Sequence, residues 1–161
     1  MDSKKISIIS IFTVLTVILL GLVSASNIGY TGGADPERGI SIESIEFNIP
    51  DGYMKNDSKT IINQSNNTGD KGYVLNQQTY VNVIGEEIVI SVVDYDDFDV
   101  DAKMLHKICE GADEKTLMGY SGYINRGEDF AQFAYAYDNK AVSITAPNEE
   151  LINQMLVVED A

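Results

Sequence analysis

The chain has few of the side chains that commonly carry enzyme chemistry. Its 161 residues include one cysteine, Cys109, and one histidine, His106. A zinc site needs three or four cysteine or histidine ligands, so this pair alone cannot form one. The two residues stand three apart on a predicted helix, where side chains point side by side and do not form a Cys–His nucleophile pair. We interpret Cys109 as a small, half-buried apolar residue, and the alternative is a disulfide between two copies of the chain.

Motifs typical of catalysis are also missing. A Ser/His/Asp hydrolase would have to use His106, and the GYSGY segment at residues 119–123 lacks the spacing of a Gly-x-Ser-x-Gly elbow. The sequence contains no Gly-rich phosphate loop and no basic aromatic stripe. These absences favour a non-catalytic module. The alternative is a hydrolase that uses paired carboxylates, such as Asp96 and Glu128.

Basic residues are scarce: 11 Lys and Arg stand against 25 Asp and Glu, which gives a net charge of −14. Such a charge disfavours binding to nucleic acid and to anionic membranes, and it attracts cations, basic proteins or basic wall polymers. The alternative is that the acidic excess only keeps an exported protein soluble. Prolines number only three and 44% of residues are hydrophobic, so the chain has enough apolar material for the core of one domain.

Residues 1–25 predict export. Lys4 and Lys5 precede a charge-free apolar run at residues 6–25, which ends in Val-Ser-Ala. This is the pattern of a secretory signal peptide that is cleaved after Ala25. The run is also long enough to cross a bilayer as an uncleaved anchor, an N-terminal apolar helix. In both cases the domain is expected outside the cytoplasm, secreted or anchored to the cell membrane, and no cysteine follows the run to carry a lipid.

A single α+β domain is predicted for residues 41–158, after a linker at residues 26–40 and before a tail at residues 159–161. We expect an antiparallel sheet of five to seven strands with two helices packed on one face. Alternating or continuous apolar side chains place strands at residues 45–49, 72–82, 87–95, 117–124, 130–137 and 140–145, with a short edge strand at 60–63. Apolar stripes place the helices near residues 101–110 and 149–157, and Asn148 is expected to cap the second.

An acidic run, DYDDFDVD at residues 94–101, is the strongest candidate site. It supplies five carboxylates: Asp94, Asp96, Asp97, Asp99 and Asp101. Clustered oxygen ligands bind hard cations such as Ca²⁺, the one cofactor that the sequence suggests. The run matches the first three ligand positions of an EF-hand loop, but Ala102 and Ile108 replace the glycine and glutamate that this loop requires. The alternative is a solvated loop whose last aspartates cap the following helix.

Two further features predict surface functions. Three triplets fit the acceptor pattern for Asn-linked sugar, at Asn56, Asn63 and Asn66. Four clustered tyrosines suggest a carbohydrate or peptide platform, and the alternative is packing in the core and on the sheet faces. These tyrosines are Tyr120, Tyr123, Tyr135 and Tyr137.

Several segments occur in an order that suggests a relationship to known proteins. The chain has IEFNIPDGY at residues 45–53, a central apolar strand, a short helix, GYSGY at 119–123, an aromatic hairpin and NEELI at 148–152. Over residues 41–158 this order resembles small exported proteins of methanogenic archaea, and the layout is similar to that of the PsbP/Mog1 family, an antiparallel sheet with flanking helices. The resemblance implies a fold and a compartment and supplies no catalytic residues.

The sequence therefore predicts an extracytoplasmic module of the cell envelope. We expect it to bind a protein, a wall polymer or a cation, and not nucleic acid. It would contact the membrane through its N-terminal segment if that segment is uncleaved.

Overall fold

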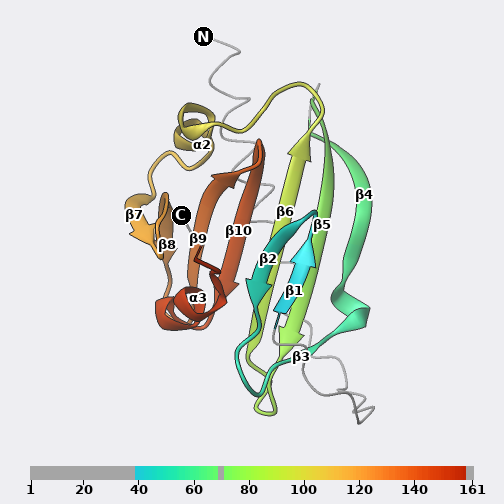
Figure 1. Cartoon of the computed structure of the whole chain (residues 1–161), viewed down its shortest axis with the longest axis vertical. Coiled ribbons are helices and arrows are strands. Elements are labelled where there is room, and N and C mark those ends of the chain that lie inside the picture. Colours follow the sequence, from blue (N-terminus) through green and yellow to red (C-terminus); the bar gives the residue numbers. More distant parts are fainter. Residues whose placement is uncertain (1–38, 69–70, 159–161) are drawn as a thin grey trace.

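The computed structural model describes residues 39–68 and 71–158 (Figure 1). The predicted leader, most of the predicted linker and the tail lie outside these ranges. No helix in the described ranges is long and apolar enough to span a membrane. The strands are β1 (Gly39–Ile42), β2 (Ile45–Asn48), β3 (Met54–Lys55), β4 (Ile61–Thr68), β5 (Lys71–Val81), β6 (Glu87–Tyr95), β7 (Asp113–Leu117), β8 (Tyr120–Arg126), β9 (Ala131–Tyr137) and β10 (Lys140–Ala146). The helices are the 3₁₀ turn η1 (Asp57–Lys59), α2 (Ala102–Ile108) and α3 (Glu149–Met155).

Eight strands form one antiparallel sheet in the order β3-β5-β6-β10-β9-β8-β7, with β4 also paired to β5. Strands β1 and β2 form a separate hairpin. The α+β class is thus confirmed, while the described part of the chain has more strands than the five to seven predicted. Strand β6 lies between β5 and β10, as its apolar side chains on both faces indicated.

Three strands were missed: the two-residue strand β3, and β1 and β7, which each belong to a hairpin. The predicted strand at 117–124 is interrupted at Met118 and Gly119, whose φ angles of 51° and 92° turn the chain back from β7 to β8. Strand β1 begins inside the predicted linker and joins β2 through Glu43 and Ser44, with φ angles of 51° and 67°. Two consecutive positive φ angles are typical of a two-residue hairpin turn. Glu and Ser are not the residues that signal such a turn, so the turn could not be predicted from its residue types.

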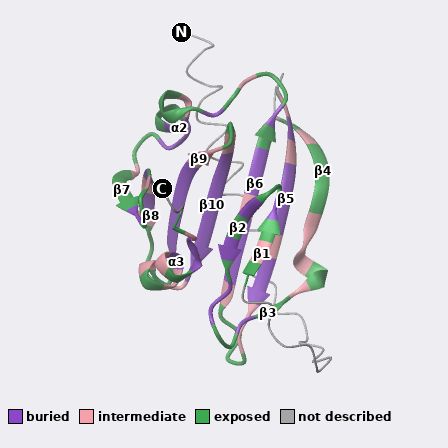
Figure 2. Ribbon diagram, in the orientation of Figure 1, coloured by how far each residue is buried: buried purple, intermediate pink, exposed green. Residues whose placement is uncertain are grey.

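The two faces of the large sheet have different covers. The hairpin face lies under the β1–β2 hairpin and α3 and holds the larger apolar cluster, which includes Phe47, Phe133 and Ile152. The α2 face lies partly under α2 and holds a smaller cluster, which includes Leu105 and Ile108. Figure 2 shows buried residues along the central strands. The prediction that both helices pack on one face is wrong, because an amphipathic stripe does not specify which side of a sheet it will cover.

The large sheet also has two distinct ends (Figure 1). Strand β6 runs from Glu87, beside the β5–β6 turn at residues 82–86, to Tyr95, beside the loop that leads into α2. We call these the tip end and the helix end. The β1–β2 hairpin returns the chain to the tip end, since Asn48 precedes the turn that leads into β3, and Met54 of β3 pairs with Val81.

Candidate functional site

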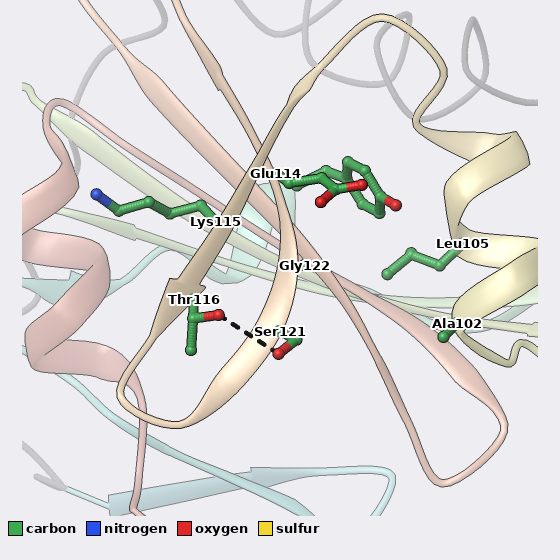
Figure 3. A pocket seen from close by; sticks show the side chains of 8 residues that line it. Ala102, Leu105, Glu114, Lys115, Thr116, Ser121 and Gly122 are labelled. Atoms are coloured by element: carbon green, nitrogen blue, oxygen red, sulfur yellow. Dashed lines mark hydrogen bonds between the residues drawn. The ribbon is translucent and has the colours of Figure 1, made fainter.

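A groove of about 310 Å³ lies between α2 and the β7–β8 hairpin (Figure 3). It is lined by Ala102, Leu105, Glu114, Lys115, Thr116, Ser121, Gly122 and Tyr123. Glu114 pairs with Tyr123 and Thr116 with Ser121 across the hairpin, so these four share the strand face that turns toward α2. Lys115 points to the other side, where its Nζ lies 3.2 Å from Glu149 Oε1. The polar groups that face the groove are therefore hydroxyl groups and one carboxylate, beside the aliphatic side chains of Ala102 and Leu105.

Gly122 allows β8 to lie close against β9 beside this groove. A Cβ atom at Gly122 would collide with the carbonyl oxygen of Ala134 and press on the ring of Phe133. Gly122 therefore thins the strand where an aromatic ring packs, whereas Gly119 lies in the β7–β8 turn with a φ of 92°.

A short chain of hydrogen bonds runs along the groove. His106 Nδ1 lies 2.7 Å from Tyr123 Oη, and the two rings are tilted with centroids 5.7 Å apart. Burial raises the pKa of Tyr123, and the charge of Glu114 and a hydrogen bond to its carboxylate raise it further. The Tyr123 hydroxyl has one proton, and when that proton is donated to Glu114, His106 must donate its Nδ1 proton to Tyr123 Oη.

These groups can bind a polar ligand in several ways. The hydroxyls of Thr116 and Ser121 lie 3.4 Å apart, and each can donate or accept a hydrogen bond. The Glu114 carboxylate accepts only, and the Tyr123 ring offers an apolar surface beside its hydroxyl. Such a combination of an aromatic ring with a few convergent polar groups is typical of small-ligand sites.

Cys109 is only 1% exposed and belongs to the apolar cluster of the α2 face. Burial raises the pKa of its thiol to about 12, so the thiol is protonated and unreactive at neutral pH. The apolar interpretation is confirmed, and the side chain is more deeply buried than predicted. His106 is exposed and contacts Tyr123, so the two residues do not act as a nucleophile pair.

The five aspartates of the acidic run do not converge. Asp94 is an exposed residue of β6, and Asp96 lies in the loop beyond, its backbone N–H donating to Gly72 O. Asp101 Oδ1 accepts a hydrogen bond from Met104 N at 2.7 Å, which confirms the helix-cap alternative for this residue. Within residues 39–68 and 71–158, no three acidic, histidine or cysteine side chains are grouped to hold a metal ion.

Asp96 and Glu128, suggested as a catalytic carboxylate pair, lie at opposite ends of the sheet. Asp96 follows β6 at the helix end. Glu128 precedes β9, whose first residue pairs with Ala146, beside the pairing of Thr145 with Val89 near the tip end. Six residues of extended strand, about 20 Å, separate Val89 from Tyr95 along β6. The two carboxylates therefore cannot act on one bond.

Of the three predicted glycosylation sites, Asn56 caps η1, and Asn63 and Asn66 lie on the neighbouring edge strand β4. Each asparagine is at least partly exposed. Asn56 Oδ1 accepts hydrogen bonds from the N–H and the hydroxyl of Ser58. Asn63 exchanges hydrogen bonds with the side chain of Asn76, and Asn66 Nδ2 donates to Gln64 O. Glycosylation at these sites stays a prediction.

The four clustered tyrosines do not form one platform. Tyr120, Tyr135 and Tyr137 pack together on the hairpin face, with the ring centroid of Tyr120 at 4.7 Å from that of Tyr135 and 6.1 Å from that of Tyr137. Tyr120 also donates a hydrogen bond to Val157 O. Tyr123 lies on the opposite face and is the one member that lines the groove.

Sequence reasoning missed the partners of Tyr123 because it missed β7. The alternation of Glu114, Thr116 and their intervening residues, followed by a glycine at 119, was the available signal for a strand and a turn. No protein-family model, curated protein or solved structure matches this chain. The function is therefore inferred from the site itself.

Proposed function

We propose that this protein is a non-catalytic, extracytoplasmic module of the cell envelope. Its groove between α2 and the β7–β8 hairpin binds a wall polymer whose sugars are neutral or carry amino groups. The observation that carries the proposal is the row of polar groups on one side of the hairpin, Glu114, Thr116, Ser121 and Tyr123, beside the exposed His106.

Hydroxyl-rich ligands suit this row. Sugar hydroxyls both donate and accept hydrogen bonds, as the Thr116 and Ser121 hydroxyls do, and a sugar ring presents an apolar face that can lie on the Tyr123 ring. The groove is partly open to solvent, which suits a chain of sugars better than an enclosed small molecule.

The negative charge of the protein excludes anionic polymers from the expected ligands. The net charge of −14 and the carboxylate of Glu114 in the groove repel an anionic polymer. An ammonium group on an amino sugar would instead form a charge-assisted hydrogen bond with Glu114. Lys115 does not counter this, since its Nζ is turned toward Glu149.

Calorimetric titration of the full chain with chitosan oligomers, an uncharged β-glucan oligomer and an anionic oligomer tests the proposal. We expect binding to the first two and none to the third. Glu114→Gln should weaken binding of the amino-bearing oligomer about tenfold or more, because hydrogen bonds to charged groups contribute about 1.5–3 kcal/mol. Tyr123→Ala should weaken binding of both.

Asp113→Asn is the matched control for charge. Asp113 is the residue next to Glu114 and is exposed, and it pairs with Ile124 on the face turned away from α2. This variant removes the same charge as Glu114→Gln without touching the groove, so we expect less than about a twofold change in binding. Equal effects of the two variants, or binding that survives Tyr123→Ala, would reject the groove as the site.

A further inference from the structure

Two adjacent aliphatic side chains stand out at the tip end. Val83 and Ile84 in the β5–β6 turn are 73% and 76% exposed. Single exposed apolar residues are common on protein surfaces and need no explanation. An adjacent pair at the tip of a turn forms a small continuous apolar surface, which suggests that a membrane or another molecule covers it.

The turn that carries the pair is rigidly held. Asn82 Oδ1 accepts hydrogen bonds from Ile84 N at 3.1 Å and Glu86 N at 2.9 Å, and Asn82 Nδ2 donates to Glu86 Oε2 at 2.8 Å. Gly85 N donates to Asn82 O at 3.0 Å, with a φ of 87° that glycine adopts without strain. Polar side chains at positions 83 and 84 would suit this backbone equally well, so the turn itself does not require the two aliphatic residues.

The tip end is also where the described chain begins. Gly39 pairs with Asn48, and the chain continues from Asn48 through a short turn into β3, where Met54 pairs with Val81. Val81 lies two residues before Val83. Residues 26–38, which connect this point to the predicted anchor, can span at most about 45 Å when fully extended.

We infer that the tip formed by Val83 and Ile84 inserts into the head-group region of the membrane that holds the leader. The inference rests on the extracytoplasmic, membrane-anchored form of the proposed function. A connection that enters at the tip end allows this turn to reach the bilayer, and aliphatic side chains at a turn tip can enter the boundary between head groups and acyl chains. The groove then lies away from the membrane. Strand pairing places Gly122 in line with Val92 across the sheet, and Val92 is about 17 Å along β6 from Glu87 at the tip end.

Charges near the tip select the lipid. Asp51 and Glu86 are exposed there, and Glu87 is paired with Lys59 Nζ at 2.6 Å. Carboxylates near the surface of an anionic membrane are repelled, so the tip should favour a bilayer of neutral lipid. The tether supplies the remaining affinity, since it keeps the local concentration of lipid high.

Depth-dependent quenching in vesicles tests this inference. The full chain, with its leader, is reconstituted into phosphatidylcholine vesicles that contain a lipid with a nitroxide on its acyl chain. Val83→Cys is labelled with an environment-sensitive fluorophore, while Cys109 stays unlabelled because it is 1% exposed. Asp97→Cys, an exposed position in the loop at the helix end, is the matched control.

We expect the quencher to reduce emission from the Val83 site about twofold and to leave emission from the Asp97 site nearly unchanged. Adding Ile84→Ser to the Val83→Cys protein should restore the lost emission. Equal quenching at the two sites, no quenching at the tip, or quenching that survives Ile84→Ser would overturn the inference. Protection of the tip fluorophore by a partner protein in the absence of lipid would also overturn it.

The same vesicles separate this inference from the proposed function. Oligomer binding to the groove is measured on them with the wild-type chain and with Ile84→Ser. Normal oligomer binding without any quenching at the Val83 site rejects the lipid contact alone. Tip insertion without any oligomer binding rejects the groove as a polymer site and leaves the lipid contact standing.

Discussion

The two faces of the large sheet differ in both cover and composition. The hairpin face is closed by the β1–β2 hairpin and α3, and its fully buried side chains are aromatic and aliphatic, among them Phe133 and Ile144. The α2 face has one short helix as its described cover, and its buried side chains include Gln77, Gln132 and Ser143. The hairpin face therefore supplies most of the apolar stabilisation, and the α2 face carries the polar groups and the groove.

The polar side chains of the α2 face are only partly satisfied. Ser91 Oγ donates to Gln77 Oε1 at 3.1 Å, and Gln132 Nε2 donates to Ser143 Oγ at 3.0 Å. Gln77 Nε2 is buried and has no hydrogen-bond partner among the described residues. A buried amide without a partner costs free energy, so this face gives up stability that the hairpin face retains.

Matched truncations of isoleucine should produce the largest difference between the faces. Ile144→Ala, at the centre of the hairpin face, should lower the free energy of unfolding by about 4 kcal/mol, and Ile108→Ala in α2 by about 2 kcal/mol. Both side chains are almost fully buried, but a short helix can move to fill a cavity and a central strand cannot. Urea unfolding monitored by circular dichroism measures both values. Equal losses would show that the α2 face stabilises the fold as much as the hairpin face.

Substitution of Gln77 on the α2 face should stabilise the protein, in contrast to the isoleucine truncations. Gln77→Met keeps the length of the side chain and removes the unpaired Nε2 group. The Ser91 hydroxyl, which loses its bond to Oε1, is partly exposed and can bind water, so we expect the free energy of unfolding to rise by about 1 kcal/mol. Gln132→Met, which removes an amide that does have a partner, should lower it by about 1 kcal/mol. A destabilised Gln77→Met protein would indicate that a ligand or another part of the chain binds this amide.

Acid should weaken the attachment of α3 to the hairpin face. Arg126 donates hydrogen bonds to Glu149 Oε2 from Nη2 at 2.7 Å and from Nε at 3.2 Å, and Lys115 lies 3.2 Å from Oε1. The Arg126 hydrogen bonds, with Lys115, lower the pKa of Glu149 below its ordinary value of 4.5. Because the folded pKa is the lower one, this stabilisation is present above about pH 4.5 and is lost as the pH falls through the folded pKa.

The melting temperatures of the wild type and Glu149→Gln test this pH dependence. The wild type should melt higher at pH 7, and the difference should shrink as the pH falls below about 4.5. Glu150→Gln, an exposed neighbour in the same helical turn, is the control and should show a smaller effect. A difference between the wild type and Glu149→Gln that does not depend on pH would mean that the ion pairs are not its source.

Of these changes, added calcium should have the smallest effect on stability. The aspartates of residues 94–101 lead into α2 but do not group around one point, so saturating calcium should change the melting temperature by less than about 1 °C relative to a chelator. A rise of several degrees that disappears in Asp97→Asn would restore the cation site that the sequence suggested. That result would also give the α2 face a source of stability that its packing lacks.

Local chemistry allowed much of the fold to be predicted. The periodicity of residues 87–95 gave β6 with its observed bounds, and Asn148 and Asp101 cap their helices as expected. These features depend on neighbours within a few residues. The β7–β8 turn and the whole of β1 were not predicted, because their turns depend on backbone conformations that their residues adopt only in the folded context.

Less of the candidate site was available from sequence. His106 and the tyrosines were considered as candidate site residues, but their partners depend on strand register. Glu114 lies opposite Tyr123 only because β7 pairs with β8. A shift of one residue in that register would turn Glu114 away from the groove. The acidic run suggested a cation site because its carboxylates are close in sequence, but among the described residues they are not grouped to hold an ion.

The sequence by itself determined the α+β class, the central strand, the helix caps and the strongly acidic charge, because each follows from side-chain chemistry over a short span. The tertiary structure alone decided which face each helix covers and which side chains line the groove. It also decided that Val83 and Ile84 lie at the end of the sheet where β3 pairs with β5. These depend on long-range strand pairing, in which residues far apart in sequence become neighbours through register and side-chain alternation.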